Sequence, residues 1–248
     1  MVINTAAGNE ILMKADMMVT AIARLLMDGE TVFHGVSSPV PMTAVKLAKK
    51  LHAPDLVYLN IPGGVDGSPS GMLNTSTAGA DLLDKSPAYF PLMEIFDLSM
   101  RGGLDVAFLS GVQFDPFGNV NASVIGDYSK PKVRLPGGAG SAVLIPTAKK
   151  PIIWRTVHNK RTFVEKCDFN TTRGNLHRIV TPLCMFRMEA GRVVLDSVFP
   201  YSSVDEVRAN TGFELDCSSV RTEPEPTKEE LRLLRMIDPK KIRTMEFK

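Results

Sequence analysis

Three consecutive segments near the N-terminus decide the fold: ETVFHGV at residues 30–36, MTAVKLAKKL at 42–51 and LVYLNI at 56–61. The first and third are rich in β-branched and apolar residues, which favour strands. The second repeats its apolar residues at helical spacing and carries lysines toward its C-terminal end. A strand, a helix and a strand with short connections are typical of a parallel βαβ unit with a right-handed crossover. The sequence therefore predicts an α/β protein whose sheet is covered on both faces.

Further helices and strands extend this unit in both directions. Apolar residues recur at helical spacing from Glu10 to Met27, and a third helix is expected from about Pro91 to Arg101, before a buried strand from Leu104 to Ser110. Five more β-like runs follow, at residues 142–145, 152–156, 162–169, 179–186 and 192–199. The last two of these runs flank a Met-Glu-Ala-Gly sequence and predict a hairpin.

Two capping boxes indicate helices near the C-terminus. Ser203 and Thr227 are each followed three residues later by a glutamate, so that hydroxyl and carboxylate can each bind an otherwise unpaired backbone amide. We therefore expect one domain over residues 1–248, built on an open, mostly parallel sheet with helices on both faces. A C-terminal helical extension is expected from about residue 222.

Composition and charge exclude several classes of protein. The chain has 248 residues, of which 44% are hydrophobic and 23% charged, as in ordinary globular domains. Its net charge is +2 and its basic residues are scattered, so nucleic acid is not an expected partner. Neither a basic leader with an apolar core nor a stretch of about 18 apolar residues occurs in the sequence. We therefore expect a soluble, cytoplasmic protein that does not bind membranes.

Two polar segments that directly follow predicted strands are candidate binding elements. Residues 62–79 are rich in Gly, Ser, Asn and Thr and are too long for a routine connection, which favours a binding loop or a mobile segment. Residues 111–121 contain the turn sequence Asp-Pro-Phe-Gly-Asn, so Asp115 and Asn119 either bind a ligand or cap a hairpin. The amide of Gln113, at the mouth of a sheet, could donate to a thioester or carboxylate oxygen, and its binding and structural roles are equally open.

A glycine-rich loop, LPGGAGSA at residues 135–142, precedes one of the predicted strands. Since it does not join a strand to a helix, neither a dinucleotide fingerprint nor a Walker loop fits, and a phosphate cradle is not expected. Bare backbone amides, such as those of Gly137 and Gly140, could instead stabilise a developing oxyanion, where one fixed donor is worth about 3 kcal/mol. A plain tight loop is the alternative interpretation.

Histidines and cysteines give no metal-binding pattern. The three cysteines form no CxxC pair, and the four histidines lack HxH and HExxH spacings, so we expect all seven to be structural: Cys167, Cys184, Cys217, His34, His52, His158 and His177. The absence of a GxSxG elbow argues against the commonest hydrolase fold. The segment His-Asn-Lys-Arg at residues 158–161 groups cationic donors. It either binds a carboxylate or the phosphates of a large cofactor, or it forms a solvated turn.

Taken in order, these segments resemble the β subunit of family I CoA-transferases, most closely the glutaconate CoA-transferase type. The motifs that carry the resemblance are HAPD at 52–55, G-x-Q-x-D-P-x-G-N-V-N at 111–121, IGDY at 125–128 with KPK at 130–132, H-x-K-R-x-F at 158–163, NTGF at 210–213 and IDP at 237–239. Each motif alone is weak, but their common order along most of the chain is specific. The resemblance implies an α/β sandwich, a homologous α subunit, and an active site where the two subunits meet.

In that family a β-subunit glutamate, at the end of the strand after Ala-Pro-Asp, attacks the acyl-CoA and becomes a glutamyl-CoA thioester. The matching position here is Ile61, and the next carboxylate belongs to Asp66. Isoleucine carries no nucleophile, so this alignment excludes covalent CoA transfer through the chain. Similar enzymes without the glutamate, ring-opening hydrolases of steroid catabolism and a decarboxylase of the methylglutaconyl-CoA type, keep the thioester pocket and use other groups. The segment HAPDLVYL resembles the decarboxylase subunit particularly well, although that subunit has cysteine where Ile61 stands.

The resemblance predicts substrate contacts but no catalytic residue on this chain. The residues expected to contact the acyl-CoA are Asn60, Ile61, Pro62, Gly63, Gln113, Asp115, Asn119, Gly137 and Gly140. We expect no metal and no permanently bound cofactor, with coenzyme A entering only as part of the substrate. The leading interpretation is an acyl-CoA hydrolase, lyase or decarboxylase whose acid or base comes from a homologous α subunit. Genuine CoA transfer and a catalytically silent subunit that completes the α-subunit pocket are the alternatives.

Overall fold

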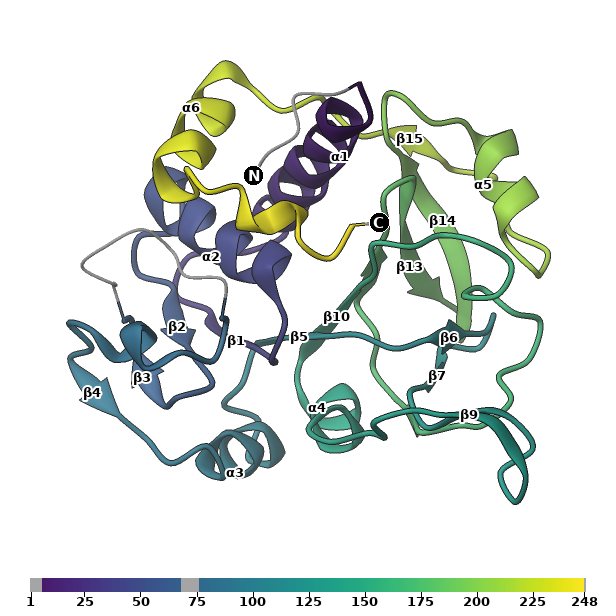
Figure 1. Ribbon diagram of the computed structural model, residues 1–248, viewed down its shortest axis with the longest axis horizontal. Helices are drawn as coiled ribbons and strands as arrows, with labels where there is room; N and C mark the ends of the chain where they lie inside the picture. The colour runs from purple at the N-terminus through teal and green to yellow at the C-terminus, as the bar shows by residue number, and fades with distance from the viewer. Residues whose placement is uncertain (1–5, 68–75, 248) are drawn as a thin grey trace. The chain divides into compact units, whose positions relative to one another are not determined.

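The computed structural model describes residues 6–67 and 76–247 (Figure 1). The chain forms two compact units. Unit 1 consists of Met1–Leu98, Leu104–Phe108 and Glu225–Lys248, and unit 2 of Ser99–Gly103 and Leu109–Pro224. The single domain expected over residues 1–248 stays a prediction. The C-terminal segment that was expected to be an extension belongs to unit 1.

The expected βαβ unit forms the start of the sheet in unit 1. Strands β1 (Thr31–His34) and β2 (Val57–Leu59) are parallel, with Val32 opposite Tyr58, and helix α2 (Pro39–Leu51) lies between them in sequence. Every residue from Pro39 to Val45 is buried, because prolines start the helix and an apolar face follows. The carboxyl ends of β1 and β2 therefore meet at one edge of the sheet, where open α/β sheets bind their ligands.

Three more strands complete the sheet of unit 1. Strand β5 (Val106–Leu109) is parallel to β1 on the side away from β2. Beyond β2, the short strands β3 (Gly64–Val65) and β4 (Ala88–Tyr89) are antiparallel. Parallel strands at the centre, alternating with helices along the chain, confirm the α/β class. Ile61 stands in the turn between β2 and β3, at the carboxyl edge of the parallel strands.

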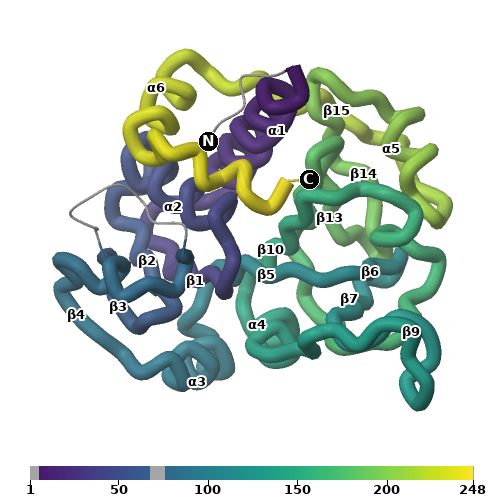
Figure 2. The backbone as a smooth tube through the Cα atoms, viewed as in Figure 1, coloured from purple at the N-terminus to yellow at the C-terminus, as the bar shows by residue number. Residues whose placement is uncertain are grey.

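Helices from both ends of the chain pack together in unit 1. Helix α1 (Ala6–Ala23) packs on α2, and both contact α6 (Lys228–Ile237), so the N-terminal and C-terminal segments lie side by side (Figures 1 and 2). Helix α1 begins and ends four residues earlier than the apolar pattern predicted. Leu26 is nevertheless buried, because a turn after the helix continues its apolar face.

A buried cation fixes the C-terminal segment. The Arg243 side chain is 2% exposed; its Nε donates to Asp16 Oδ1 at 2.6 Å and its Nη1 to Asp238 Oδ2 at 2.8 Å. A buried guanidinium is tolerated only when carboxylates pair with it. The capping box predicted at Thr227 is present and starts α6. The IDP motif therefore acts in unit 1 as an anchor, because it supplies Asp238.

The sheet of unit 2 contains both parallel and antiparallel pairs. The inner pair, β10 (Lys150–Trp154) and β12 (Arg178–Val180), is parallel. Strand β13 (Cys184–Glu189) is antiparallel to both of its neighbours, β12 and β14 (Arg192–Val198). At the edge, β15 (Arg221–Thr222) is parallel to β14. The predicted hairpin is β13–β14, and its turn residues Ala190 and Gly191 both have positive φ, as a tight hairpin requires.

The other elements are short. Two small sheets in unit 2 have the strand orders β11–β7–β6 and β8–β9. Their strands are β6 Gln113–Phe114, β7 Asn119–Asn121, β8 Val124–Gly126, β9 Pro131–Arg134 and β11 Thr172–Arg173. The remaining helices are η1 Ala80–Leu83, α3 Glu94–Met100, α4 Ser141–Thr147, α5 Val204–Asn210 and η2 Ile242–Thr244. None of the helices in the described ranges is long and apolar enough to cross a membrane.

Two of the expected strands are absent. The run at residues 142–145 is part of helix α4, which begins after Gly140 and includes Pro146 in its last turn. A short apolar run does not distinguish a strand from a buried helix by periodicity. The run at 162–169 is irregular apart from one bridge between Phe163 and Phe114. The glycine loop thus leads from a strand into a helix, and the premise that it precedes a strand was wrong.

Candidate functional site

The turn after β2 is held by the side chain of Asn60. Asn60 is fully buried, its Nδ2 donates to Leu82 O at 2.9 Å, and its Oδ1 accepts from Gly64 N at 2.8 Å. Gly63 has φ +96°, and a Cβ at this position would lie 2.1 Å from Phe90 O, so only glycine fits. Asn60 and Gly63, two of the expected substrate contacts, therefore shape the turn; contact with substrate stays a prediction.

Ile61 and Pro62 form the half-buried tip of this turn. The first carboxylate that follows, Asp66, is already engaged: its Oδ1 accepts from Lys49 Nζ at 2.8 Å and from Tyr58 N at 2.9 Å. Both bonds are accepted by Oδ1, and they tie the carboxylate of Asp66 to helix α2 and strand β2. Residues 68–75, the middle of the expected binding loop, lie outside the described residues.

A buried pair of polar side chains joins strand β1 to strand β2. His34 Nδ1 contacts Gly35 O at 2.9 Å, which makes Nδ1 the protonated nitrogen, and His34 Nε2 accepts from the Tyr58 hydroxyl at 2.5 Å. Burial lowers the pKa of His34 to about 4 and raises that of Tyr58. Lys46 Nζ lies 5.3 Å from the centre of the Tyr58 ring, and burial lowers its pKa to about 8. His34 is structural, as the sequence predicts, whereas nothing in the sequence marked Lys46.

In unit 2 the β6–β7 turn is held by Asp115. The carboxylate is 2% exposed and accepts from Phe117 N at 3.0 Å, from Asn119 N at 3.2 Å and from Asn119 Nδ2 at 2.8 Å. This is the capped hairpin that the turn sequence allowed as an alternative to ligand binding. The carboxylate of Asp115 is therefore not free to act as an acid or base.

Gln113 is also engaged within the fold. Its Oε1 accepts from Asn121 Nδ2 at 2.7 Å and from Asp168 N at 3.1 Å, and its Nε2 donates to Asp168 Oδ2 at 3.2 Å. The side chain is 6% exposed. The amide thus joins the hairpin to the segment around Asp168, and its contact with a thioester stays a prediction.

The glycine loop differs from the hairpin because it leaves amides unbound. Gly137 N donates to Ala122 O at 2.8 Å. In contrast, the amide of Gly140 has no acceptor in residues 6–67 and 76–247. Gly140 precedes α4 with φ −63°, and the first amides of a helix have no partner within it. Of the two glycines predicted to offer a donor, only Gly140 has one available.

The cationic segment at 158–161 divides into two parts. His158 contacts Thr181 Oγ1 at 2.9 Å and Thr211 Oγ1 at 3.2 Å, and its ring lies 4.4 Å from that of Phe163. Burial lowers the pKa of His158 to about 3, so the ring is neutral and structural. Lys160, two residues on, lines a pocket.

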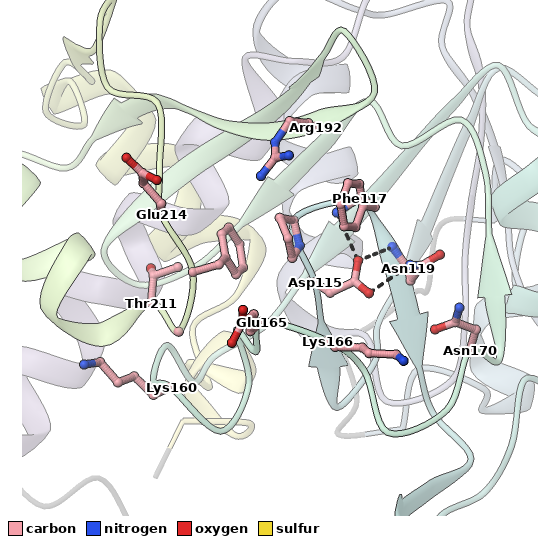
Figure 3. A pocket seen from close by; sticks show the side chains of 13 residues that line it. Asp115, Phe117, Asn119, Lys160, Glu165, Lys166, Asn170, Arg192, Thr211 and Glu214 are labelled. Carbon is pink, nitrogen blue, oxygen red and sulfur yellow. Dashed lines mark hydrogen bonds between the residues drawn. The ribbon is translucent and has the colours of Figure 1, made fainter.

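This pocket, of about 1060 Å³, opens in unit 2 beside the β6–β7 turn (Figure 3). Its wall contains Asp115 and Asn119, two of the predicted contacts. It also contains residues that no sequence motif combines, among them Phe117, Arg192 and Phe213. Three of the four segments that line the pocket carry motifs named in the sequence analysis, at 111–121, 158–163 and 210–213, but their spacing does not show that they meet, and no motif marked Arg192.

The described part of the chain contains no cluster of metal-binding side chains, and two of its three cysteines are buried. No group of three or more His, Cys, Asp or Glu side chains there is arranged to hold a metal ion. Burial raises the pKa of Cys167 to about 12 and raises that of Cys184 as well. Buried thiols with raised pKa values are poor nucleophiles.

Comparisons with known proteins point to one family. The family model for coenzyme A transferase matches residues 15–210. The β subunit of the 3-oxoadipate CoA-transferase of Pseudomonas knackmussii is 35% identical, over 90% of this chain and 92% of that protein. The β subunit of the glutaconate CoA-transferase of Acidaminococcus fermentans is 30% identical, again over 90% of this chain and 92% of that protein.

A solved structure extends the comparison to three dimensions. The crystal structure of the decarboxylase AibA/AibB superposes on the chain with a TM-score of 0.89 and 28% sequence identity. The superposition covers 94% of this chain and 98% of that chain. Proteins described as transferases and one described as a decarboxylase are thus similar to this chain along nearly its whole length.

Proposed function

The chain belongs to the coenzyme A transferase family as a β subunit, and from this premise we propose that it acts on an acyl-CoA thioester without forming a glutamyl-CoA on its own side chains. The reaction is hydrolysis, carbon–carbon lysis or decarboxylation of the acyl part. An α subunit supplies the acid or base. Coenzyme A takes part only as a portion of the substrate.

The observation that carries this proposal is the turn after β2. Ile61 occupies its tip, where the resemblance would require a glutamate, and Asp66 is bound to Lys49 and to the backbone of β2. A covalent route needs an activated nucleophile, and this turn offers none. The amide of Gly140 suits the non-covalent alternative, since it could stabilise the negative charge that develops on a thioester carbonyl or an enolate.

Similarity to the decarboxylase AibA/AibB supports a lytic or decarboxylating reaction. The names of the two transferase relatives support the second candidate, transfer of CoA between carboxylic acids. The two candidates differ in one requirement. A transferase consumes a second carboxylate as acceptor of CoA, whereas a hydrolase, lyase or decarboxylase does not.

The partner is an α subunit that covers apolar surface of this chain. Tyr89, Leu92 and Met93 lie close together in sequence and expose 67%, 41% and 74% of their surface. Clusters of exposed large apolar side chains are typical of protein interfaces. Each of the two transferase relatives is itself named as one subunit of its enzyme, which supports an assembly of two kinds of chain.

The cytoplasmic location expected from the sequence stays a prediction.

The test is a product analysis on the complex assembled with its α subunit. The complex is incubated with a panel of acyl-CoAs, with and without an added carboxylate such as acetate, and all CoA species are quantified by mass spectrometry. We expect acyl-CoA consumption that does not depend on the acceptor, and no turnover by this chain alone. Consumption that requires the acceptor and yields its CoA ester would establish the transferase instead.

A further inference from the structure

The loops that follow β1 and β2 present apolar side chains at the carboxyl edge of the sheet in unit 1. Ile61 and Pro62 form the half-buried tip of the turn after β2. Val36, in the loop after β1, is 64% exposed. Phe33 lies opposite Leu59 in the parallel β1–β2 pair, so the two loops leave the sheet side by side. Val36, Ile61 and Pro62 are called the apolar edge below.

The start of helix α2 reaches the same end of β1 but offers few hydrogen-bond donors. The first amides of a helix have no partner within it and commonly bind anions. Pro39 and Pro41 are the first and third residues of α2 and have no N–H, so Val40 is the only possible donor among the first three. The amide of Ser38, just before the helix, donates to Thr77 Oγ1 at 3.1 Å. This helix start is therefore poorly suited to bind a carboxylate.

The lysines of α2 point away from the apolar edge. Lys49 Nζ donates to Leu56 O, just before β2 begins, and to Asp66 Oδ1 at 2.8 Å. Lys46 Nζ donates to Gly67 O at 3.4 Å, after the end of β3. Strands β1 to β4 and helix η1, which pack around the turn, contain neither lysine nor arginine. The elements of unit 1 that form this edge thus supply no cation to it.

The α subunit would enclose the apolar edge. Phe90 N donates to Gly63 O at 2.8 Å, so the segment with the exposed Tyr89 and Met93 begins beside the turn. That segment belongs to the surface proposed to bind the α subunit. A partner bound there would exclude water from the turn. A carboxylate in this place would lose its hydration and gain neither a cation nor an amide of unit 1 in return.

We propose that the acyl group of the substrate is hydrocarbon where it meets this chain: alkyl or aryl carbons pack on Val36, Ile61 and Pro62, and no carboxylate lies there. Hydrocarbon gains about 0.8 kcal/mol for each CH₂ group that it buries. This inference rests on the proposed function, because it takes the substrate to be an acyl-CoA, and it adds the class of acyl group. A carboxylate that leaves as CO₂ would have to lie against the α subunit.

The test measures binding of two matched analogues to the complex assembled with its α subunit. S-pentyl-CoA and S-(4-carboxybutyl)-CoA are thioethers of equal chain length that cannot be hydrolysed, and they differ in a terminal methyl or carboxylate. By calorimetry we expect S-pentyl-CoA to bind about 10-fold more tightly than the carboxylate analogue, and more tightly than CoA itself. Equal or tighter binding of the carboxylate analogue, or S-pentyl-CoA binding no better than CoA, would overturn the proposal.

Variants that carry a new cation locate the preference on the apolar edge. Ile61→Lys and Val36→Lys should each improve binding of the carboxylate analogue about 10-fold relative to S-pentyl-CoA, because the carboxylate gains a charged partner. Met27→Lys is the matched control, since Met27 is 60% exposed and precedes β1 at the other end of the strand. If Ile61→Lys fails to fold or assemble, Val36→Lys decides, because its side chain is exposed. An unchanged preference in assembled Val36→Lys would overturn the proposal.

The binding preference is measured without turnover, so it separates this proposal from the proposed function. The expected preference together with turnover that requires an acceptor carboxylate would refute the proposed function alone. Acceptor-independent turnover together with tighter binding of the carboxylate analogue would refute only the present inference. Failure of CoA and of both analogues to bind would refute both.

Discussion

The hairpin at residues 113–121 and the glycine loop at 137–140 use their polar groups in opposite ways. In the hairpin, the side chains of Gln113 and Asp115 are buried and hydrogen-bonded to neighbouring residues. In the loop there are few side chains to bind, and the amide of Gly140 has no acceptor among the described residues. A dense polar motif can therefore serve mainly to hold the fold, whereas a glycine-rich loop can leave backbone donors without a partner.

The largest effect is expected in the hairpin. Asp115→Ala leaves the amides of Phe117 and Asn119 without an acceptor in a buried turn, which should lower the free energy of unfolding by about 3 kcal/mol. Urea unfolding of the purified chain measures it. Asp127→Ala is the matched control, because Asp127 Oδ1 accepts from Ser129 N at 2.8 Å in a similar but exposed turn. If both variants lose the same stability, Asp115 is not a buried anchor.

In the glycine loop the expected effect is on catalysis. Gly140→Pro removes the N–H, and the observed φ of −63° suits the proline ring. We expect kcat of the assembled enzyme to fall about 100-fold, with a smaller change in KM, because the lost donor acts mainly in the transition state. Gly140→Ala keeps the amide and should retain most activity. A folded, assembled Gly140→Pro enzyme with normal kcat would reduce this loop to a plain turn.

A smaller effect on stability is expected from His158, which, like Gln113 and Asp115 of the hairpin, is buried and hydrogen-bonded within the fold. Its pKa is lowered from 6.5 to about 3 by burial, so below pH 6.5 the unfolded chain binds a proton that the folded chain does not. Stability should therefore fall as pH falls, by about 1 kcal/mol between pH 6.5 and 5.5 from this residue. Urea unfolding of the wild type and of His158→Gln at several pH values measures the slope. An unchanged slope in the variant would contradict a buried neutral histidine.

The sequence predicted well those features that depend on local pattern. The βαβ unit, the β13–β14 hairpin and the capping box at Thr227 each follow from spacing or turn chemistry that acts within a few residues. Helix α4 was missed, because its four apolar residues after the glycine loop suit a strand equally well and only tertiary packing decides between them.

The candidate site was predictable only in part. Motifs pointed to Gln113, Asp115 and Asn119, but no spacing tells whether a buried amide or carboxylate bonds to the protein or to a ligand. Arg192 and Phe117 are 75 positions apart in the sequence, and their contact exists only in the folded chain. The sequence can show which residues have suitable functional groups. Only the folded structure shows whether those groups are already hydrogen-bonded to the protein or are free to bind a ligand.

The central claim, that no covalent intermediate forms on this chain, has a direct test. The complex assembled with its α subunit is incubated with its acyl-CoA, treated with borohydride or hydroxylamine, and digested for mass spectrometry. Either reagent would convert a thioester on a Glu or Asp side chain into a stable derivative. With Ile61 at the tip of the turn, we predict that every Asp and Glu of this chain is recovered unmodified. A modified Asp or Glu in this chain, dependent on acyl-CoA, would contradict the account.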